Sequence, residues 1–431
     1  MRDSQALLPA ETFAANREFV AEQMLAPDQA IVAYFARAQL APPGVERVLL
    51  DDALGRILAV DARAAEDHPA HARSTMDGFA VASRDGAAAR RIAGEIRMGH
   101  APPHGIRPGE AMRIPTGGAL PDGADAVVPV EDAVEEDGAI ILRGVVAAGD
   151  YFTPAASDMA AGEIALHAGR RIGGPELGVL ATLGVTDVPV YRRPLFGVVS
   201  TGDELVDAER ALHTGQVRDS NRYAVAGALR AMGVDVRQFP RAIDEPESLR
   251  SVLSAVLDEC DGVLLTGGSS VGARDLVPRV TASLGEPGVI VHGIRLKPGK
   301  PTMLAAVGSS PVIGLPGNPT SSLMVLEAVV RPVISACTGE RGARAEVVDA
   351  IADAPFEGRD GWTWFVPAQV RSVAGRLLAV PLRLHSAHVS LLARATGYVV
   401  LGEHPSRIER GEPVRVRRFS CGGAAIVEAS A

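Results

Sequence analysis

The chain has 431 residues, a formal net charge of -9 and a hydrophobic composition of 47%. One hydrophobic core seldom grows beyond about 250 residues, so we expect at least three domains. The 43 basic and 52 acidic residues are interspersed without a basic stripe, which argues against a nucleic-acid partner and favours a small-molecule ligand. Cys260, Cys337 and Cys421 are widely spaced. This spacing argues against a disulfide framework and a cysteine zinc site, and it predicts a cytoplasmic protein.

The first 26 residues are rich in alanine and carry charges without a continuous apolar periodicity, so we expect a disordered or frayed extension. They lack the basic-then-apolar pattern of a secretion signal. No apolar run approaches the roughly 18 residues that a membrane helix requires. We therefore expect no membrane segment, and we expect helical spacing to begin at Pro27, in PDQAIVAYFARAQ.

Three segments with different residue patterns follow this helix. Residues 62–148 contain short apolar runs separated by Gly, Pro and Asp (FAVA, AMRI, AVVPV, AIILR), the pattern of short strands and turns. In residues 191–338, apolar strands such as LFGVV, GVLL and PVIGL alternate with helical windows such as NRYAVAGALRAMG and PESLRSVLSAVLDEC. This alternation predicts a three-layer α/β domain with a mostly parallel sheet. In residues 339–421, WFVPAQV, RLLAVPLRL, GYVVLGE and PVRVRRF predict a second mainly β domain.

Four loops of the α/β segment follow strands, and ligands of open parallel sheets bind beyond the carboxyl ends of the strands. The first loop is STGDELV, in which Asp203 and Glu204 could hold Mg²⁺; a solvated acidic turn is an equal alternative. In the second loop, Asp219, Ser220 and Asn221 precede a helical run. One of the three is expected to cap this helix, and capping alone remains an alternative to ligand binding.

The third loop is TGGSSVGARD, residues 266–275. Its glycines would let backbone N–H groups approach an anion, its serines add hydroxyl donors, and Asp275 could take a metal ion or orient a hydroxyl. The loop matches neither the P-loop nor the dinucleotide-binding fingerprint.

The fourth loop is RLKPGKPTML followed by IGLPGNPTSS, and in it Lys297 and Lys300 flank a Pro-Gly turn. The second half leads into a helix that we expect to be capped by Thr320 or Ser321. Two ammonium groups beside a helix N-terminus suit a multiply charged oxyanion, whereas two solvated lysines on a stiff turn are the alternative.

These segments resemble a known family, the molybdopterin molybdenumtransferases of the MoeA type, also called molybdenum insertases and similar to the E domain of gephyrin. The matching segments run in the family's order between Pro27 and Phe419: STMDGFAV, PTGGALPDGADAVV, STGDELV, RDSNR, LTGGSSVGARD, LKPGKPTM and GLPGNPTSS. The resemblance implies that adenylylated molybdopterin binds, that its adenylyl phosphoanhydride is cleaved with Mg²⁺, and that molybdate is transferred to the dithiolene, giving molybdenum cofactor and AMP.

The same resemblance implies a domain organisation and partners. Residues 27–61 and 149–190 would form a discontinuous linking and dimerisation domain, residues 62–148 an inserted β domain, residues 191–338 the molybdopterin-binding domain, and residues 339–421 a barrel-like domain. The resemblance also implies an elongated homodimer with each active site between subunits. Transient contact with other proteins of molybdenum cofactor synthesis is expected, whereas nucleic acid and membrane are not.

Site residues also follow from the resemblance, position by position. The implied catalytic residues are Asp77, Asp158, Glu204, Asp275, Lys297 and Lys300. The implied metal ligands are Asp203, Glu204 and Asp275. The implied cofactor-binding residues are Thr201, Gly202, Asp219, Ser220, Asn221, Gly267, Gly268, Ser269, Ser270, Gly272, Pro298, Gly299, Pro316, Gly317, Asn318, Ser321 and Ser386. Asp77 and Asp158 would complete the site across the dimer interface.

The chain departs from the family's pattern at His71-Ala72, at YFTPAASDM (residues 151–159) and near Pro367, where the family has an arginine. These departures suit a second hypothesis, a non-catalytic protein that carries molybdopterin or the finished cofactor. A third hypothesis is an adenylyltransferase that makes the adenylylated intermediate, against which the flanking β segments argue.

Overall fold

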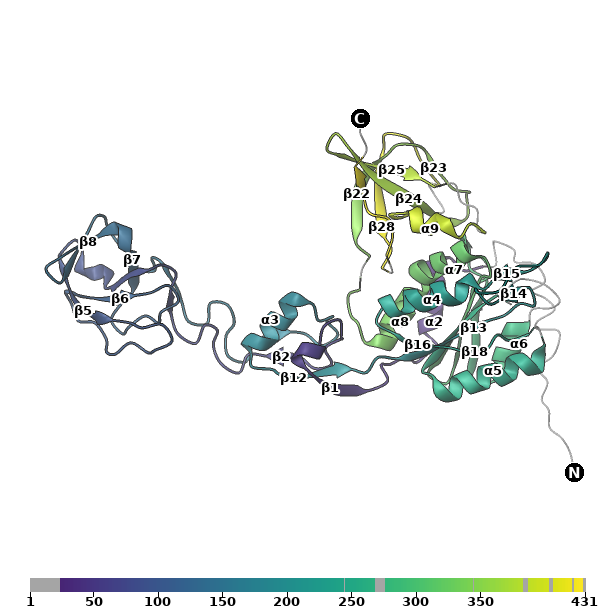
Figure 1. Ribbon diagram of the computed structural model, residues 1–431, viewed down its shortest axis with the longest axis horizontal. Coiled ribbons are helices and arrows are strands. Elements are labelled where there is room, and N and C mark those ends of the chain that lie inside the picture. Colours follow the sequence, from purple (N-terminus) through teal and green to yellow (C-terminus); the bar gives the residue numbers. More distant parts are fainter. Residues whose placement is uncertain are drawn as a thin grey trace, which may run out of the picture.

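The computed structural model describes residues 24–243, 245–267, 276–343, 345–382, 387–402, 406–420 and 422–428. The chain is elongated (Figure 1): the inserted β domain lies at one end, the linking domain in the middle, and the α/β and C-terminal domains at the other end. Residues 1–23 of the expected frayed extension lie outside the described residues. The expectation is wrong for its last residues, because Met24 is buried and the backbone N–H of Arg295 donates to the Leu25 carbonyl at 2.9 Å.

The α/β domain is built on a six-stranded sheet with strand order β16-β13-β17-β21-β20-β18. The first four strands are parallel, and β20 and β18 run antiparallel to their neighbours. The predicted strands LFGVV, GVLL and PVIGL are confirmed as β13, β17 and β21. In sheet order the strands are β16 (Asp235–Gln238), β13 (Leu195–Ser200), β17 (Gly262–Thr266), β21 (Ser310–Leu315), β20 (Met303–Val307) and β18 (Pro287–His292).

Helices cover both faces of this sheet, so the predicted three-layer architecture is confirmed. One face packs against α2 (Pro27–Phe35), α4 (Ser220–Ala231), α7 (Pro319–Val325) and α8 (Arg331–Thr338), the last two joined by a π-helical turn, Leu326–Val330. The other face packs against α5 (Pro246–Glu259) and α6 (Leu276–Ala282). Side chains alternate along each strand, so Val198 of β13 lies in one core and Val199 in the other.

Helix α2 belongs to the α/β domain and not to the linking domain, which corrects the boundary set at residue 27. Its Tyr34 is fully buried, and the Tyr34 hydroxyl donates to the Ala305 carbonyl of β20 at 3.1 Å. Just after the helix, Arg37 Nη2 donates to the Pro287 carbonyl of β18 at 3.1 Å. The apolar face of α2 is thus buried against the sheet, a contact distant in sequence that local periodicity does not reveal.

One helical run, Pro319–Thr338, reaches the length and apolarity of a membrane helix, with 20 residues and a mean hydropathy of 1.3 in its most apolar window. The expectation that no segment approaches this length is therefore wrong. In the fold, 67% of that window is buried, because the run comprises α7, the π-helical turn and α8 packed on the sheet. The run is therefore a core helix of the α/β domain.

Two mainly β units form the arm that extends from the α/β domain (Figure 1). The linking domain contains β1 (Val45–Leu49) paired with β12 (Asp187–Tyr191), β2 (Ala62–Arg63) paired with β11 (Ile164–Leu166), a 3-10 turn (Leu50–Asp52) and α3 (Gly174–Thr182). Beyond it, β3 (Arg73–Ser74) pairs with β10 (Phe152–Thr153).

The inserted domain at the far end of the arm is a six-stranded sheet in the order β7-β4-β6-β5-β9-β8. The predicted strands of this segment are confirmed. The elements are β4 (Gly78–Val81), β5 (Arg90–Glu95), β6 (Glu110–Ile114), β7 (Ala126–Pro129), β8 (Ala133–Glu136) and β9 (Ala139–Leu142), with 3-10 turns at Ser83–Asp85 and Val130–Asp132.

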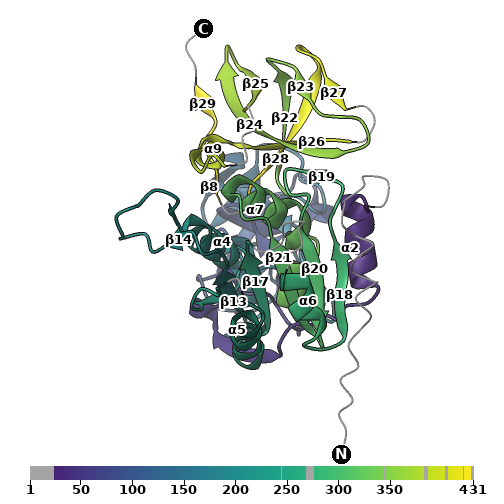
Figure 2. The same cartoon turned by 90° about the vertical axis from the view of Figure 1, so that its right-hand side faces the viewer.

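The C-terminal domain is a barrel, because β24 pairs with both β25 and β26 and so closes the ring β24-β25-β22-β28-β26. Its ring strands are β22 (Val347–Ala352), β24 (Thr363–Val373), β25 (Arg376–Pro381), β26 (Gly397–Leu401) and β28 (Pro413–Arg418). Helix α9 (Ser390–Arg394), the pair β23 (Phe356–Glu357) and β27 (Arg407–Ile408), and β29 (Val427–Glu428) complete it. In Figure 2 this barrel lies directly above the α/β domain, with α7 and β19 (Leu296–Lys297) on the facing side.

Candidate functional site

Four segments of the chain reach the carboxyl edge of the parallel strands. Three of them follow β13, β17 and β21, which are parallel and therefore end at the same edge; of the segment after β17 the structure describes Gly267. The fourth segment, residues 297–302, precedes β20, and Met303 at the start of β20 lies opposite Gly314 near the end of β21. The predicted fourth loop is therefore two segments, because β20 and β21 lie between its halves. Because β20 is antiparallel to β21, its preceding loop reaches the edge that the other strands reach with their following loops.

Hydrogen bonds join these loops to one another. Thr201 N–H donates to the Thr266 carbonyl at 2.9 Å, and Gly267 N–H donates to the Leu315 carbonyl at 3.2 Å. Gly267 has φ of 91°, and a Cβ at this position would lie 2.6 Å from the Thr201 carbonyl oxygen. Any other residue would therefore clash here. Glycine is therefore required at position 267 because two protein loops approach each other closely there. The sequence had suggested a different reason, contact with an anion.

Two buried side-chain oxygens at this edge have no hydrogen-bond partner among the described residues. They are Thr201 Oγ1, just after β13, and Asn221 Oδ1, in the first turn of α4. The Asn221 amide is held in place because its Nδ2 donates to the Gly317 carbonyl at 2.7 Å. A buried polar atom without a partner costs about 1–3 kcal/mol, so the pair indicates that this edge receives a polar ligand.

Asp203 and Glu204 place two exposed carboxylates at the end of β13. Glu204 folds back along the chain, since a Cβ on Gly202 would lie 2.7 Å from Glu204 Oε2. Mg²⁺ prefers oxygen ligands and is commonly bound by one or two carboxylates together with substrate phosphates and water. The donor set therefore fits Mg²⁺, although the described residues contain no group of three or more Asp, Glu, His or Cys arranged to hold a metal.

The helix caps at the site agree with one prediction and contradict another. Asp219 caps α4, because its Oδ1 accepts from the Arg222 N–H at 3.1 Å. The predicted capping of α7 by Thr320 or Ser321 is wrong: the N-cap residue is Asn318, and proline occupies the first helical position. Proline is favoured there because it has no N–H to satisfy and its φ is already helical. The Thr320 hydroxyl instead donates to the His388 carbonyl at 2.7 Å.

Lys297 and Lys300 are the only lysines in the sequence; every other basic residue among the 43 is arginine. Lys297 is exposed in β19, which pairs with β24 of the barrel, and its Nζ lies 5.6 Å from the ring centroid of Trp362. The turn between the lysines is tightly packed, because a Cβ on Gly299 would lie 2.2 Å from Val325 Cγ2. Trp362, which sequence reasoning missed, is signalled only by its place in the polar segment GRDGWTWF.

The remaining predicted binding residues fall into two groups. Pro298, Pro316 and Ser321 are buried beside the fourth loop or in the first turn of α7, and Ser220 is half-buried in the first turn of α4. The others lie outside the described residues: Gly268, Ser269, Ser270, Gly272, Asp275 and Ser386.

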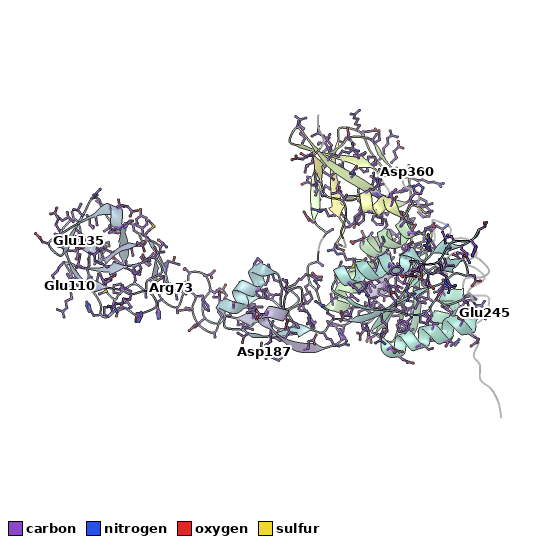
Figure 3. All side chains as sticks on the ribbon, in the orientation of Figure 1. Arg73, Glu110, Glu135, Asp187, Glu245 and Asp360 are labelled. Carbon is purple, nitrogen blue, oxygen red and sulfur yellow. The ribbon has the colours of Figure 1, made fainter. Side chains whose placement is uncertain are left out.

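Asp77 and Asp158 do not join this site within one chain. Both are exposed, and both lie on the arm, near the pairing of β3 with β10. Asp77 Oδ1 accepts from the Thr116 N–H at 2.7 Å, and the Asp158 N–H donates to the His68 carbonyl at 3.0 Å. Figure 3 shows Arg73, on the adjoining β3, far from Glu245 of the α/β domain.

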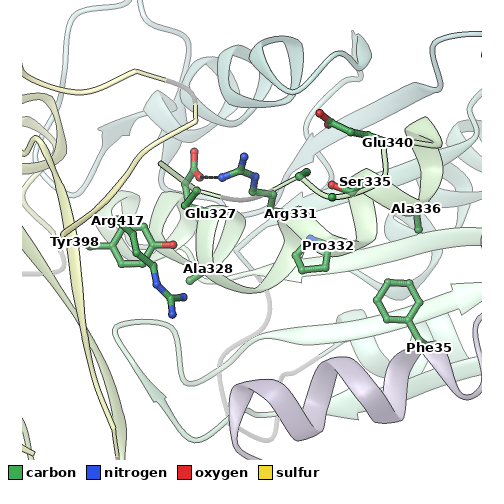
Figure 4. Close-up of a pocket in the computed structure, with 13 residues that line it drawn as sticks. Phe35, Glu327, Ala328, Arg331, Pro332, Ser335, Ala336, Glu340, Tyr398 and Arg417 are labelled. Carbon is green, nitrogen blue, oxygen red and sulfur yellow. Dashed lines mark ion pairs between the residues drawn. The ribbon is translucent and has the colours of Figure 1, made fainter. Parts of the chain in front are cut away.

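A pocket of about 490 Å³ lies away from this edge, between α8, α2 and the barrel (Figure 4). Glu327 on its wall is almost fully buried, and its Oε1 accepts from the Ser420 backbone N–H at 3.0 Å and from the Ser420 hydroxyl at 2.6 Å. Arg331 Nη1 lies 4.0 Å from Glu327 Oε2. These contacts attach the barrel to the long helix of the α/β domain, so the pocket marks a domain junction.

Replacing Asn221 with alanine is expected to lower the free energy of unfolding by about 1 kcal/mol, because the Gly317 carbonyl loses the amide that pairs with it, while removal of the unpartnered Oδ1 offsets part of the loss. Urea unfolding followed by far-UV circular dichroism measures the change. Tyr223→Ala is the matched control, since Tyr223 is exposed on the same helix. Equal stability of the two variants would contradict a structural role for this hydrogen bond.

Comparison with known proteins agrees with this architecture. The chain matches the family profiles "MoeA N-terminal region (domain I and II)" over residues 23–184, "Probable molybdopterin binding domain" over 197–336 and "MoeA C-terminal region (domain IV)" over 349–419. It is 32% identical over 383 residues to a molybdopterin molybdenumtransferase of Bacillus subtilis, covering 86% of this chain and 89% of the relative. A second relative so named, from Synechococcus elongatus, is 30% identical over 406 residues, covering 91% and 99%.

A crystal structure of a molybdopterin biosynthesis MoeA protein from Pyrococcus horikosii is 30% identical, with a TM-score of 0.74, and the match covers 92% of this chain and 99% of that one. Fold and site thus define a multidomain protein with a β-rich arm and an α/β domain whose sheet edge gathers polar side chains. The chain belongs to the molybdopterin molybdenumtransferase family.

Proposed function

We propose that this protein acts in molybdenum cofactor biosynthesis in the cytoplasm, where it transfers molybdate to adenylylated molybdopterin and releases AMP in a Mg²⁺-dependent reaction. The observation that carries the proposal is the meeting of four chain segments at one sheet edge, where Thr201 Oγ1 and Asn221 Oδ1 have no hydrogen-bond partner in the part of the chain that the structure describes. This edge combines carboxylates, hydroxyl and amide groups and two ammonium groups, a mixture that suits a phosphoanhydride together with a tetrahedral oxyanion.

Each group has a defined task in this reaction. Asp203 and Glu204, with Asp275, would hold Mg²⁺, which supplies positive charge to the phosphate oxygens when it is bound. Lys297 and Lys300 would bind the molybdate dianion and orient it toward the dithiolene. The pterin and phosphate groups would be held by the hydroxyl and amide groups of Thr201, Ser220, Asn221 and Ser321. The implied cofactor-binding residues of the loop 266–275 and Ser386 would contribute to the same contacts.

We further propose that the active unit is a homodimer in which the arm of one subunit reaches the sheet edge of the other. The location of Asp77 and Asp158 near the β3–β10 pair supports this arrangement, because Arg73 of β3 lies far from Glu245 of the α/β domain (Figure 3). The linking domain also exposes Val45, Leu49 and Leu54, with exposed fractions of 57%, 66% and 61%. Exposed apolar side chains gathered on one small domain favour a protein interface.

A cytoplasmic location is supported by two free cysteines. Cys260 and Cys337 are buried and unpaired, and burial raises the pKa of the Cys337 thiol to about 12. Such a thiol stays neutral and is a poor nucleophile, so a structural role fits Cys337 better than a catalytic one.

The purified protein is expected to release AMP from adenylylated molybdopterin with Mg²⁺, and molybdate is expected to accelerate the release. Chelation of Mg²⁺ and the variant Asp275→Ala should each abolish it. Asp258→Ala, an exposed carboxylate on α5, is the matched control and should keep full activity.

Two other outcomes would contradict the proposal. Tight binding of the cofactor without AMP release would indicate a carrier. Consumption of Mg-ATP with free molybdopterin would indicate an adenylyltransferase.

A further inference from the structure

Arg171, between β11 and α3 of the linking domain, contacts three parts of the chain. Its Nε donates to Glu340 Oε1 at 2.9 Å and its Nη2 to Glu340 Oε2 at 2.7 Å, a bidentate ion pair. Its Nη1 also donates to the Gly55 carbonyl at 3.0 Å, and its Nη2 to the Met232 carbonyl at 3.1 Å. One guanidinium therefore joins the linking domain, the end of α4 and the segment after α8.

Both helices that end at Arg171 begin at the candidate site. Helix α4 starts at the Asp219 cap, and its C-cap is Met232. The run from α7 to α8 starts at the Asn318 cap and ends at Thr338, two residues before Glu340. Helix C-termini carry partial negative charge, so a cation bound to the last carbonyls is stabilising. Arg171 thus holds the far ends of the two helices whose N-termini face the sheet edge.

The backbone around this ion pair is closely packed. The Arg341 N–H donates to the Gly169 carbonyl at 2.8 Å, and a Cβ on Gly169 would lie 2.6 Å from Arg341 Cγ. A Cβ on Gly233 would lie 3.1 Å from Arg171 Nη1. The Glu340 side chain is only 17% exposed. Figure 4 shows Glu340 just beyond the end of α8, near Ser335 and Ala336. A bidentate fork fixes the angle between its partners as well as their distance.

We propose that the Arg171–Glu340 pair is a positioning clamp that sets the direction of the arm, formed by the linking and inserted domains, relative to the α/β domain. Because the inserted domain lies at the far end of the arm, a small rotation at the clamp becomes a large displacement there. The effect on catalysis rests on the proposed function, in which the arm presents Asp77 and Asp158 to the site of a second subunit. A misplacement of about 1 Å can cost about 10²-fold in rate.

The direction of the arm can be measured without any activity assay. Fluorophores are introduced through non-natural amino acids at two exposed positions, Ala181 on α3 and Glu247 on α5. The labelled chains are then mixed with excess unlabelled protein. Single-molecule energy transfer then reports the distance distribution between linking and α/β domains. Arg171→Met is expected to broaden this distribution. Arg170→Met is the matched control, because Arg170 pairs with Glu176 entirely within the linking domain, with Nε 2.8 Å from Oε1.

The kinetic readout separates positioning from general damage. Arg171→Met is expected to lower kcat for AMP release by about tenfold or more with little change in KM, since the binding loops are untouched. Arg171→Lys, which keeps the charge but loses the fork, should recover only part of the rate. If Arg171→Met does not fold, Glu340→Gln and Arg171→Lys serve for both readouts.

An unchanged distance distribution in the folded variants would overturn the clamp. A loss of kcat in Arg171→Met no greater than the loss in Arg170→Met would also overturn it. If the wild-type protein releases no AMP, the proposed function fails, and the distance distributions still decide on the clamp.

Discussion

Replacing Lys297 or Lys300 with arginine is expected to lower kcat/KM for molybdate-dependent AMP release by about 10²-fold, although the charge is kept. The ammonium group is a compact charge with three rotatable donors, whereas the guanidinium is a larger planar fork. The chain uses arginine at every other basic position, so lysine at these two positions indicates a need that arginine does not meet. The packed turn between them fixes the backbone that presents both side chains, since a Cβ on Gly299 would lie 2.2 Å from Val325 Cγ2.

Steady-state kinetics with molybdate as the varied substrate measures the effect, and molybdate binding by calorimetry locates it. The loss should appear in molybdate binding as well as in turnover. Arg279→Lys, an exposed position on α6, makes the opposite exchange in the same domain and should leave the kinetics unchanged. Wild-type kinetics in both Lys→Arg variants would show that positive charge alone suffices at this site.

A heterodimer that pairs an Asp77→Ala subunit with a Lys300→Ala subunit is expected to recover about half of the wild-type activity, whereas each mutant homodimer is nearly inactive. In the proposed dimer, every site combines the sheet edge of one subunit with the arm of the other. One of the two sites in this heterodimer then has both an intact edge and an intact arm, and the other site lacks both. The recovery follows from geometry alone.

The experiment uses co-expression with two affinity tags, purification of the heterodimer and measurement of AMP release per dimer. A heterodimer of Asp77→Ala with Asp158→Ala is the matched control. Both changes lie on the arm, so neither of its sites is intact and no recovery is expected. Recovery in this control, or its absence in the first heterodimer, would contradict a site shared between subunits.

The sequence predicted most elements of the α/β domain and the place of its loops. The windows 221–233 and 246–260 are found as α4 and α5, and the predicted strands LFGVV, GVLL and PVIGL are confirmed as β13, β17 and β21. These predictions succeed because apolar periodicity and Gly/Pro turn chemistry are local properties. The α7 cap was missed because proline at the first helical position favours Asn318 as the cap and frees the Thr320 hydroxyl for the barrel.

Local residue patterns show which residue types follow which strands, and hence that carboxylates, glycines and lysines belong to strand-end loops. The positions of those loops in space depend on how the strands and domains pack. Residues 297–302 reach the common edge because β20 is antiparallel to β21, and α2 joins the α/β core because its apolar face is buried there. Likewise, Arg171 meets Glu340 across a long separation in sequence. Contacts of this kind depend on strand direction and domain packing, which no local pattern of residues encodes.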